Sequence, residues 1–160
     1  MRKREREVTD EQTIREILEK SKVLHLGLAD ADMPYVVPMN YGYIYENGKL
    51  TLYMHGATEG YKYEVIRRNP KVSFAMECDV VPFEGKMPCQ YGTSYAGIMG
   101  QGKAAIVENV DEKIQALTVL MKTQTGKDFV FNEKLVSIVS VIRVDVETFS
   151  AKKRPFPGEM

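Results

Sequence analysis

The sequence predicts a mainly β fold of the α+β class, an antiparallel sheet of six strands closed into a small barrel with helices packed outside. Six segments of alternating hydrophobicity lie at short spacing, and an Asn-Gly pair joins two of them. The helical segments between them are too few for the strict β-α-β alternation of a doubly wound parallel sheet. We expect one domain over residues 1–160, with flexible tails at 1–9 and 150–160.

The first half of the chain predicts one helix and then three strands. A helix is expected over 10–20, where Thr9 and Gln12 have the spacing of a capping box and apolar residues recur with helical period. The strands after it read VLHLGLA, YVVPMNYGYIY and KLTLYMH. Asn47-Gly48 between the last two predicts a tight hairpin.

The second half predicts two helices and three further strands. A helix containing Lys62 is expected to end at Asn69-Pro70, and another to begin at Asp111 as its cap and stop at Gly126. The strands read KVSFAMECD, SYAGIMGQGKAAIVE and SVIRVDVETF. Residues 80–93 contain two prolines and two glycines, so an irregular loop is expected there.

Composition excludes several classes of function. Lys and Arg together number 22, as do Asp and Glu, so no global charge favours nucleic acid or an anionic membrane as partner. The N-terminal MRKREREV has no apolar run of a signal peptide, and no stretch reaches the roughly 20 apolar residues of a membrane span, so we expect a cytoplasmic protein. The spacing of Cys78 and Cys89 suggests no metal site.

The segment LYMHGATEGYK places a lysine at the start of a predicted helix, where a cation is disfavoured by roughly 0.3–1 kcal/mol. With Thr58 as cap and Gly60 on the first turn, free backbone N–H groups and the Lys62 amine would together suit a phosphate. The alternative is an exposed lysine paired with Glu59.

Two histidines differ in their surroundings. His55 lies at a strand end on the face opposite the apolar row, where it can bind a ligand, exchange a proton, or simply bond a backbone carbonyl. His25 lies within an apolar run and is expected to be a core residue.

A proline interrupts the second predicted strand. Pro38 removes a ladder donor, which implies a strand edge or a bulge. Asn40 shares a face with Gly42, where a flat ligand would meet no side chain, so a planar heterocycle can lie along this strand. An ordinary edge strand blunted by proline is the alternative.

The run PYVVPMNYGYIYENGKLTLYMHGATEGYKYEVIRRNPKVSFAME resembles the core of the pyridoxamine 5′-phosphate oxidase-like flavoproteins, and most of all their nitroimidazole-resistance branch. The resemblance extends from Asp10 to about Phe149 and centres on His-Gly-Ala followed by Gly60 and Lys62. It implies a split β-barrel that forms a homodimer and binds FMN in two grooves at the subunit interface.

The resemblance also implies site residues. Lys62 and the turn 57–60 would hold the FMN phosphate, Pro38 to Tyr41 would run beside the isoalloxazine, and His55 would lie near the flavin or its substrate as the catalytic candidate. The full cofactor-binding set it implies is Pro38, Met39, Asn40, Tyr41, His55, Gly56, Ala57, Thr58, Gly60, Lys62, Ser94 and Tyr95, of which the last two would reach a flavin bound mainly by the other subunit. The C-terminal SAKKRPFPGEM lacks the substrate-clamping motif of true pyridoxamine phosphate oxidases, so vitamin B6 oxidation is not expected.

The leading hypothesis is an FMN-dependent oxidoreductase that reduces a small acceptor such as a nitro-aromatic compound, with FAD an open alternative to FMN. A second hypothesis keeps the fold and drops catalysis, as a flavin- or haem-binding module. A third is a β-barrel interaction protein without a cofactor. The sequence identifies no electron donor and no physiological substrate.

Overall fold

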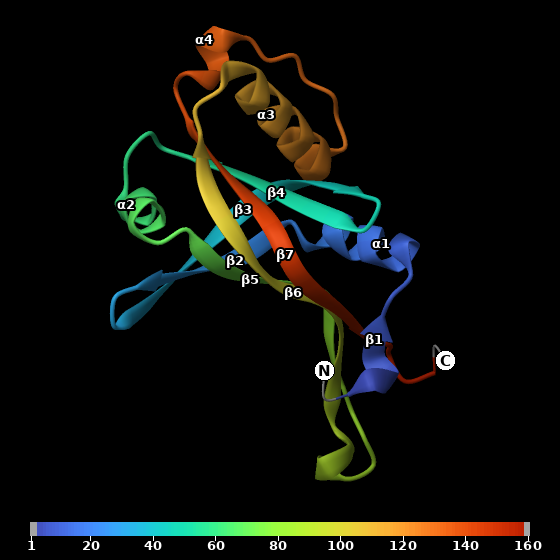
Figure 1. Ribbon diagram of the computed structural model, residues 1–160. Coiled ribbons are helices and arrows are strands. Elements are labelled where there is room, and N and C mark those ends of the chain that lie inside the picture. Colours follow the sequence, from blue (N-terminus) through green and yellow to red (C-terminus); the bar gives the residue numbers. More distant parts are fainter. Residues whose placement is uncertain (1–2, 159–160) are drawn as a thin grey trace.

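The computed structural model describes residues 3–158, which form one strongly curved antiparallel sheet with helices around it (Figure 1). Its strands are β1 (Glu7–Val8), β2 (Val23–Asp30), β3 (Met33–Glu46), β4 (Lys49–Gly56), β5 (Lys71–Phe83), β6 (Gly92–Val107) and β7 (Ser140–Arg154). Its helices are α1 (Glu11–Ser21), α2 (Tyr61–Arg68), α3 (Val110–Thr125) and α4 (Glu133–Val136), with short 3-10 turns at Arg4–Arg6 and Pro88–Gln90.

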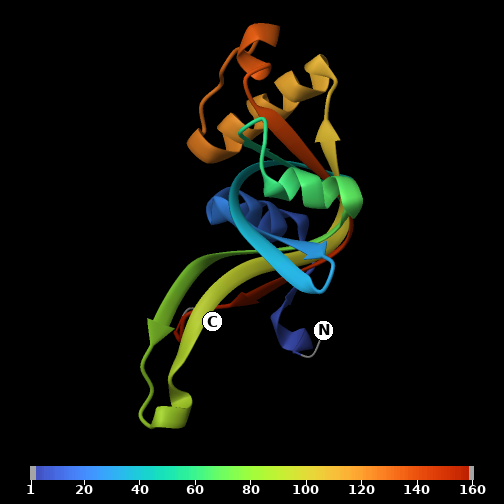
Figure 2. The same ribbon diagram turned by 90° about the vertical axis from the view of Figure 1, so that its left-hand side faces the viewer.

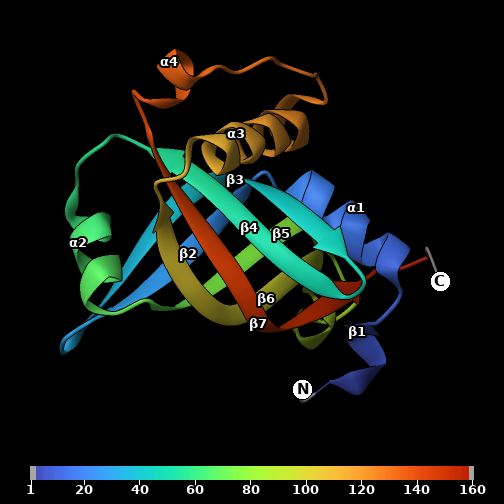
Figure 3. The same cartoon turned by 45° about the horizontal axis from the view of Figure 1, so that its top comes forward.

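Six of the strands close into a ring. Around it the order is β2, β3, β4, β7, β6 and β5, each strand is antiparallel to the next, and β5 pairs with β2 to complete the circle. Figure 3 shows this ring with α1, α2 and α3 around it. The predicted six-stranded split barrel with flanking helices is confirmed, and closure removes the free edges that an open sheet would expose.

The barrel interior is filled by alternate residues of each strand, as the period-2 patterns predict. Leu24, Leu26 and Leu28 of β2 point inward and are almost completely buried. Strand β7 continues to Arg154, and β1 pairs with it through Glu7 and Val8. The expectation of flexible tails is therefore wrong for residues 7–8 and 150–154, because these residues complete a strand pair.

The N-terminal helix α1 starts one residue later than predicted and has a different cap. The Asp10 carboxylate accepts a hydrogen bond of 2.8 Å from the backbone N–H of Thr13, so Asp10 caps the helix and Thr9 does not. One face of α1 packs into the barrel core, with Ile14, Ile17 and Leu18 buried.

The β3–β4 connection is the hairpin that Asn-Gly predicts. Asn47 has φ 51° and Gly48 has φ 75°, and Glu46 faces Lys49 across the turn. Two consecutive positive φ angles characterise the type I′ turn, whose twist matches that of the flanking strands.

Strands β5 and β6 extend beyond the barrel as a two-stranded arm, which Figure 2 shows projecting from its lower end. The expectation of an irregular loop over 80–93 is right for residues 84–91 and wrong at both ends, since pairing continues from Val81 with Ser94 to Phe83 with Gly92. Pro82 is compatible with this ribbon because each of its strands has a free outer edge. The register shifts between Cys78 and Val81, so the arm begins at a β-bulge.

Helix α3 packs on the outer face of the barrel over β3 and β4. Its cap is Asn109, whose side chain accepts from the backbone N–H of Glu112, and not Asp111 as predicted. Gly126 ends the helix in a left-handed conformation with φ 72°, as expected. None of the helices within residues 3–158 is both long and apolar enough to cross a membrane.

His25 is exposed on the outer surface of β2, so its prediction as a core residue is wrong. Its Nδ1 atom lies 4.0 Å from Oε2 of Glu77 on β5. The apolar run VLHLGLA alternates about the strand axis, and because Leu24 and Leu26 occupy the interior, His25 must face outward.

Candidate functional site

The corner between β4 and α2 brings together the residues predicted to hold a phosphate. Strand β4 ends at Gly56, and α2 begins at Tyr61 with Gly60 as its N-cap. Gly60 has φ 148° and ψ 158°, and no side chain caps the helix, so Thr58 is not the cap that the sequence predicts. The first turn therefore presents backbone N–H groups without a side-chain acceptor, at the positive end of the helix dipole.

The Lys62 side chain folds back over this corner. Its Nζ atom lies 4.7 Å from the centroid of the Tyr63 ring. A Cβ atom added to Gly56 would lie 3.3 Å from this nitrogen, and one added to Gly60 would lie 3.9 Å from it. Lys62 forms no ion pair within residues 3–158, so Glu59 is not its partner. The amine thus lies between two glycines beside the helix start.

Beneath this amine is a tyrosine hydroxyl that sequence reasoning missed. Tyr63 is 1% exposed, and its Oη atom has no hydrogen-bond partner among the described residues. The atom would lie 2.6 Å from a Cβ on Gly56, so only glycine fits at that position without movement. Burial raises the pKa of the Tyr63 phenol, and the nearby Ser140 hydroxyl lowers it by a smaller amount. The Ser140 hydroxyl itself donates to the carbonyl of Thr58 at 3.3 Å, and it forms no hydrogen bond with Tyr63.

A buried hydroxyl without a partner costs about 1–3 kcal/mol, and such groups are rare except where a ligand or water satisfies them. The corner therefore combines an unsatisfied donor, a glycine cradle, an amine and free helix N–H groups. These residues fit an anionic group such as a phosphate.

The helix that forms this corner is held at both ends by one carboxylate. Asp30, at the end of β2, accepts a hydrogen bond from the Tyr61 hydroxyl and one of 2.7 Å from the Arg68 guanidinium. Tyr61 is the first residue of α2 and Arg68 the last, and the Tyr61 ring packs edge-on against Tyr35. The hydrogen bond from Tyr61, with the Arg68 contact, lowers the pKa of Asp30.

His55 lies at the end of β4 next to this corner, on the outer face as predicted. The ring is exposed and makes no hydrogen bond or ion pair within residues 3–158, so it is not bonded to a backbone carbonyl. Its register partner is Val141 on β7. The imidazole is free to contact a ligand that reaches the corner.

The segment Pro38 to Tyr41 is only partly accessible. Residues 33–40 pair with β2 alone and β4 joins from Tyr41, so Pro38 lies on a local edge as predicted. Pro38 is exposed, whereas Met39 and Tyr41 are buried in the core, and the Tyr41 hydroxyl donates to the carbonyl of Leu18 at 2.6 Å.

Helix α3 covers the face that the sequence left open for a flat ligand. A Cβ on Gly42 would lie 2.3 Å from Cα of Leu120, so the glycine serves close packing against the helix and not a ligand. The Asn40 amide donates to the carbonyl of Lys22 and to Gln124, both at 3.3 Å. The expectation of an unobstructed surface at Asn40 and Gly42 is therefore wrong.

Ser94 and Tyr95 lie at the other end of the barrel, where the arm begins. Ser94 is buried, and its hydroxyl donates to the carbonyl of Val81 at 3.2 Å. Within one chain these residues do not join the corner at α2, since the nine residues of β5 from Lys71 to Asp79 separate the two regions, about 26 Å for eight steps of the usual strand rise.

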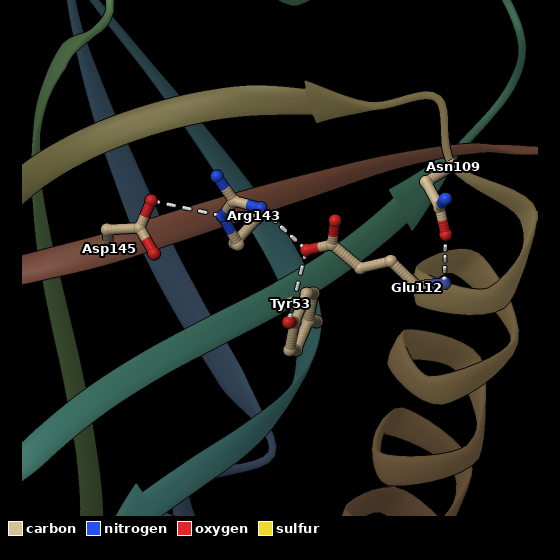
Figure 4. Close-up of polar contacts among 5 residues, drawn as sticks. All are labelled: Tyr53, Asn109, Glu112, Arg143 and Asp145. Atoms are coloured by element: carbon tan, nitrogen blue, oxygen red, sulfur yellow. Dashed lines mark hydrogen bonds and ion pairs between the residues drawn. The ribbon is translucent and has the colours of Figure 1, made fainter.

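A second polar cluster lies between α3 and the barrel (Figure 4). Arg143 on β7 donates to Glu112 at 2.7 Å and to Asp145 at 3.0 Å, and the Tyr53 hydroxyl donates to the same Glu112 carboxylate at 3.3 Å. Glu112 raises the pKa of the Arg143 guanidinium. Because Arg143 and Glu112 bond each other across the two elements, this cluster holds α3 on the sheet.

Comparison with known proteins agrees with the fold and the sequence pattern. The family model described as pyridoxamine 5′-phosphate oxidase matches residues 10–153. The chain belongs to this family. The resemblance drawn from the sequence is confirmed, including its nitroimidazole-resistance branch as a structural neighbour. No curated protein matches the chain.

Solved structures of the pyridoxamine 5′-phosphate oxidase fold resemble the chain over most of its length. A candidate 5-nitroimidazole antibiotic resistance protein from Bacteroides thetaiotaomicron is 32% identical, with TM-score 0.75 over 91% of this chain and 85% of that one. An FAD and heme binding protein from Mycobacterium smegmatis has TM-score 0.77 and 14% identity over 97% of this chain and 77% of that one. A flavocytochrome from Azotobacter vinelandii has TM-score 0.72 and 16% identity over 92% and 69%. The last two share the fold alone.

Within this family member, the structure gathers only part of the predicted set. His55, Gly56, Gly60 and Lys62 meet at the α2 corner, whereas Asn40 and Tyr41 are engaged in internal contacts. Among residues 3–158, no three His, Cys, Asp or Glu side chains are grouped to hold a metal ion. Tyr63 was missed because a tyrosine on the apolar face of a helix is usually a packing residue, and only the fold shows that its hydroxyl lacks a partner.

Proposed function

We propose that the chain binds FMN through the α2 corner and acts as an oxidoreductase that reduces a small acceptor such as a nitro-aromatic compound. The observation that carries this proposal is the convergence of Lys62, the open helix N-terminus and the unsatisfied Tyr63 hydroxyl on one glycine-lined corner. An anion there would satisfy the orphan donor and neutralise the amine. Similarity to a candidate nitroimidazole-resistance protein supports the substrate class.

Bound FMN would supply the electron or hydride transfer, and the protein would supply binding and orientation. Lys62 and the N–H groups of the first α2 turn would hold the phosphate, with Gly56 and Gly60 allowing close approach. The exposed edge at Pro38 would lie along the ring system. The free His55 imidazole would give a proton to the reduced product.

We further propose a homodimer with cofactor at the subunit interface, in which Ser94 and Tyr95 approach the flavin of the second copy. In one chain the α2 corner is an open surface feature, and a second subunit would exclude water from the ring. Analytical ultracentrifugation with and without FMN tests the assembly, and a monomer at micromolar concentration contradicts it.

The experiment that tests the phosphate site is a titration of flavin-free protein with FMN and with riboflavin, which lacks the phosphate. Lys62→Ala should lower FMN affinity about tenfold or more, because a lost hydrogen bond to a charged group is worth about 1.5–3 kcal/mol, and should leave riboflavin affinity unchanged. Lys49→Ala, which removes an exposed lysine at the hairpin turn, is the matched control. Equal FMN affinity for Lys62→Ala and the wild type removes Lys62 from the site.

The second candidate is a flavin- or haem-binding module without catalysis. The flavocytochrome and the FAD and heme binding protein, which share the fold, favour it. Absorbance spectra separate the two: bleaching by a reduced nicotinamide and recovery on adding a nitro-aromatic acceptor support the enzyme. The binding module is supported if the protein shows a flavin or haem spectrum, but the bound cofactor is not reduced by the nicotinamide and reoxidised by the acceptor.

A further inference from the structure

The Asp30 carboxylate joins the β2–β3 hairpin to both ends of α2. Its two oxygens have different partners: Oδ2 accepts from the Tyr61 hydroxyl, and Oδ1 accepts from the Arg68 guanidinium at 2.7 Å. The Asp30 side chain is only 17% exposed, and the guanidinium carbon of Arg68 lies 5.9 Å from the centroid of the Tyr61 ring. These three residues, Asp30, Tyr61 and Arg68, are called the Asp30 clamp below.

The Asp30 clamp fixes what the apolar face of α2 leaves free. Tyr63, Val65 and Ile66 bury that face in the core. Apolar contacts are non-directional, so they hold the helix on the barrel without fixing its rotation or its shift along its own axis. Tyr61 and Arg68 are seven residues apart, close to two helical turns, so they project from one side of α2 and reach the same carboxylate. With both contacts made, α2 has one position relative to β2.

Helix α2 has little stability of its own. It has eight residues, and no side chain makes an N-cap hydrogen bond. Isolated helices shorter than about 12–15 residues are marginal in water, so tertiary contacts decide where the first turn of α2 lies. Lys62 and the N–H groups of that turn are the groups proposed to hold the phosphate. Their position therefore depends on the Asp30 clamp.

The same hairpin carries the strand edge proposed to bind the ring system. Tyr35 on β3 packs edge-on against the Tyr61 ring with centroids 5.4 Å apart, and Pro38 follows three residues later on the same strand. Three residues of a strand span about 10 Å. Figure 3 shows α2 beside β2 and the end of this hairpin. The Asp30 clamp thus connects the helix that would bind the phosphate to the strand that would bind the ring.

We propose that Asp30 is a positioning residue that sets the separation between the phosphate site at Lys62 and the ring site at Pro38. This inference rests on the proposed flavin function and adds a determinant of ligand choice to it. Two sites that one ligand joins reinforce each other only when their spacing matches that ligand. Asp30 and Arg68 act through α2 and not through contact with the flavin. Loosening the clamp therefore removes the advantage that the phosphate gives FMN over riboflavin.

Titrations of flavin-free protein with FMN and with riboflavin test this role in Asp30→Asn and Arg68→Gln. Both variants should weaken FMN binding about fivefold, the size of coupling found between residues in contact, and leave riboflavin affinity unchanged. Glu112→Gln is the matched control, because Glu112 also accepts from a tyrosine hydroxyl and from an arginine guanidinium but holds α3. That variant should lower the free energy of unfolding without changing the ratio of the two affinities.

The double variant Asp30→Asn/Lys62→Ala separates positioning from a general loss of structure. If Asp30 acts by placing the Lys62 amine and the helix N–H groups beside it, removing the amine removes part of what Asp30 contributes. The loss of FMN affinity in the double variant should then be smaller than the two single losses combined.

Three results overturn the proposal: FMN affinity is unchanged in Asp30→Asn and Arg68→Gln, FMN and riboflavin affinities fall by the same factor, or the losses in the double variant combine in full. Wild-type protein that binds FMN no more tightly than riboflavin overturns the phosphate site itself, and the role of Asp30 with it. A preference for FMN that Lys62→Ala abolishes and Asp30→Asn leaves intact refutes the positioning role alone. Should Asp30→Asn fail to fold, Tyr61→Phe keeps the ring, loses the hydroxyl and should show the same selective loss of FMN affinity.

Discussion

Replacing Tyr63 by phenylalanine should make the flavin-free protein more stable and its FMN binding weaker. The hydroxyl is buried and has no partner among the described residues, so folding removes it from water without compensation. Leaving such a donor unsatisfied costs about 1–3 kcal/mol, and phenylalanine keeps the ring while removing that cost. The free energy of unfolding should therefore rise by about that amount.

Urea unfolding of flavin-free protein, followed by circular dichroism, measures this change. The slope against urea concentration should be the same for Tyr63→Phe and the wild type, because the surface exposed on unfolding is nearly equal. The control is Tyr41→Phe, since the Tyr41 hydroxyl is also buried but donates to the Leu18 carbonyl at 2.6 Å. That variant should lose about 1–2 kcal/mol, the opposite sign.

The same variant tests the binding role of the hydroxyl. Lys62 Nζ and the Tyr63 hydroxyl both lie beside Gly56, so a phosphate drawn to the amine is the acceptor we expect for the hydroxyl. Tyr63→Phe should weaken FMN by about tenfold and leave riboflavin unaffected. A fall in stability for Tyr63→Phe would refute the reasoning, because it would mean that the hydroxyl is already bonded without ligand.

Two further predictions concern the supports of the site. Gly42→Ala should cost about 1–3 kcal/mol in urea unfolding, because its Cβ would meet the Leu120 backbone at 2.3 Å and push α3 off the sheet; an unchanged midpoint would show that α3 adapts freely. Asp30→Asn should destabilise the protein at neutral pH. Since the folded pKa of Asp30 is held below its ordinary 3.8, the contribution is complete above that value and is lost as pH falls through the folded pKa. The free energies of unfolding of the wild type and Asp30→Asn should therefore converge at acid pH. A difference that stays constant with pH would mean that the ionised Asp30 carboxylate does not stabilise the protein.

Local patterns in the sequence were sufficient for the barrel and for the position of the corner between β4 and α2. The alternation in each strand, the Asn47-Gly48 turn and the Gly126 stop depend on backbone geometry that neighbouring residues set. The placement of Gly60 and Lys62 at a helix start is equally local. The structure confirms these expectations. Each concerns a feature that residues close in sequence determine.

The tertiary structure alone decided which surfaces are covered and which polar groups are left unpaired. A period-2 pattern shows that Asn40 and Gly42 share a face, but only the fold shows α3 lying on it. The isolation of the Tyr63 hydroxyl likewise results from segments distant in sequence. Burial and hydrogen bonding are properties of neighbours in space, and the closing of the barrel chooses those neighbours.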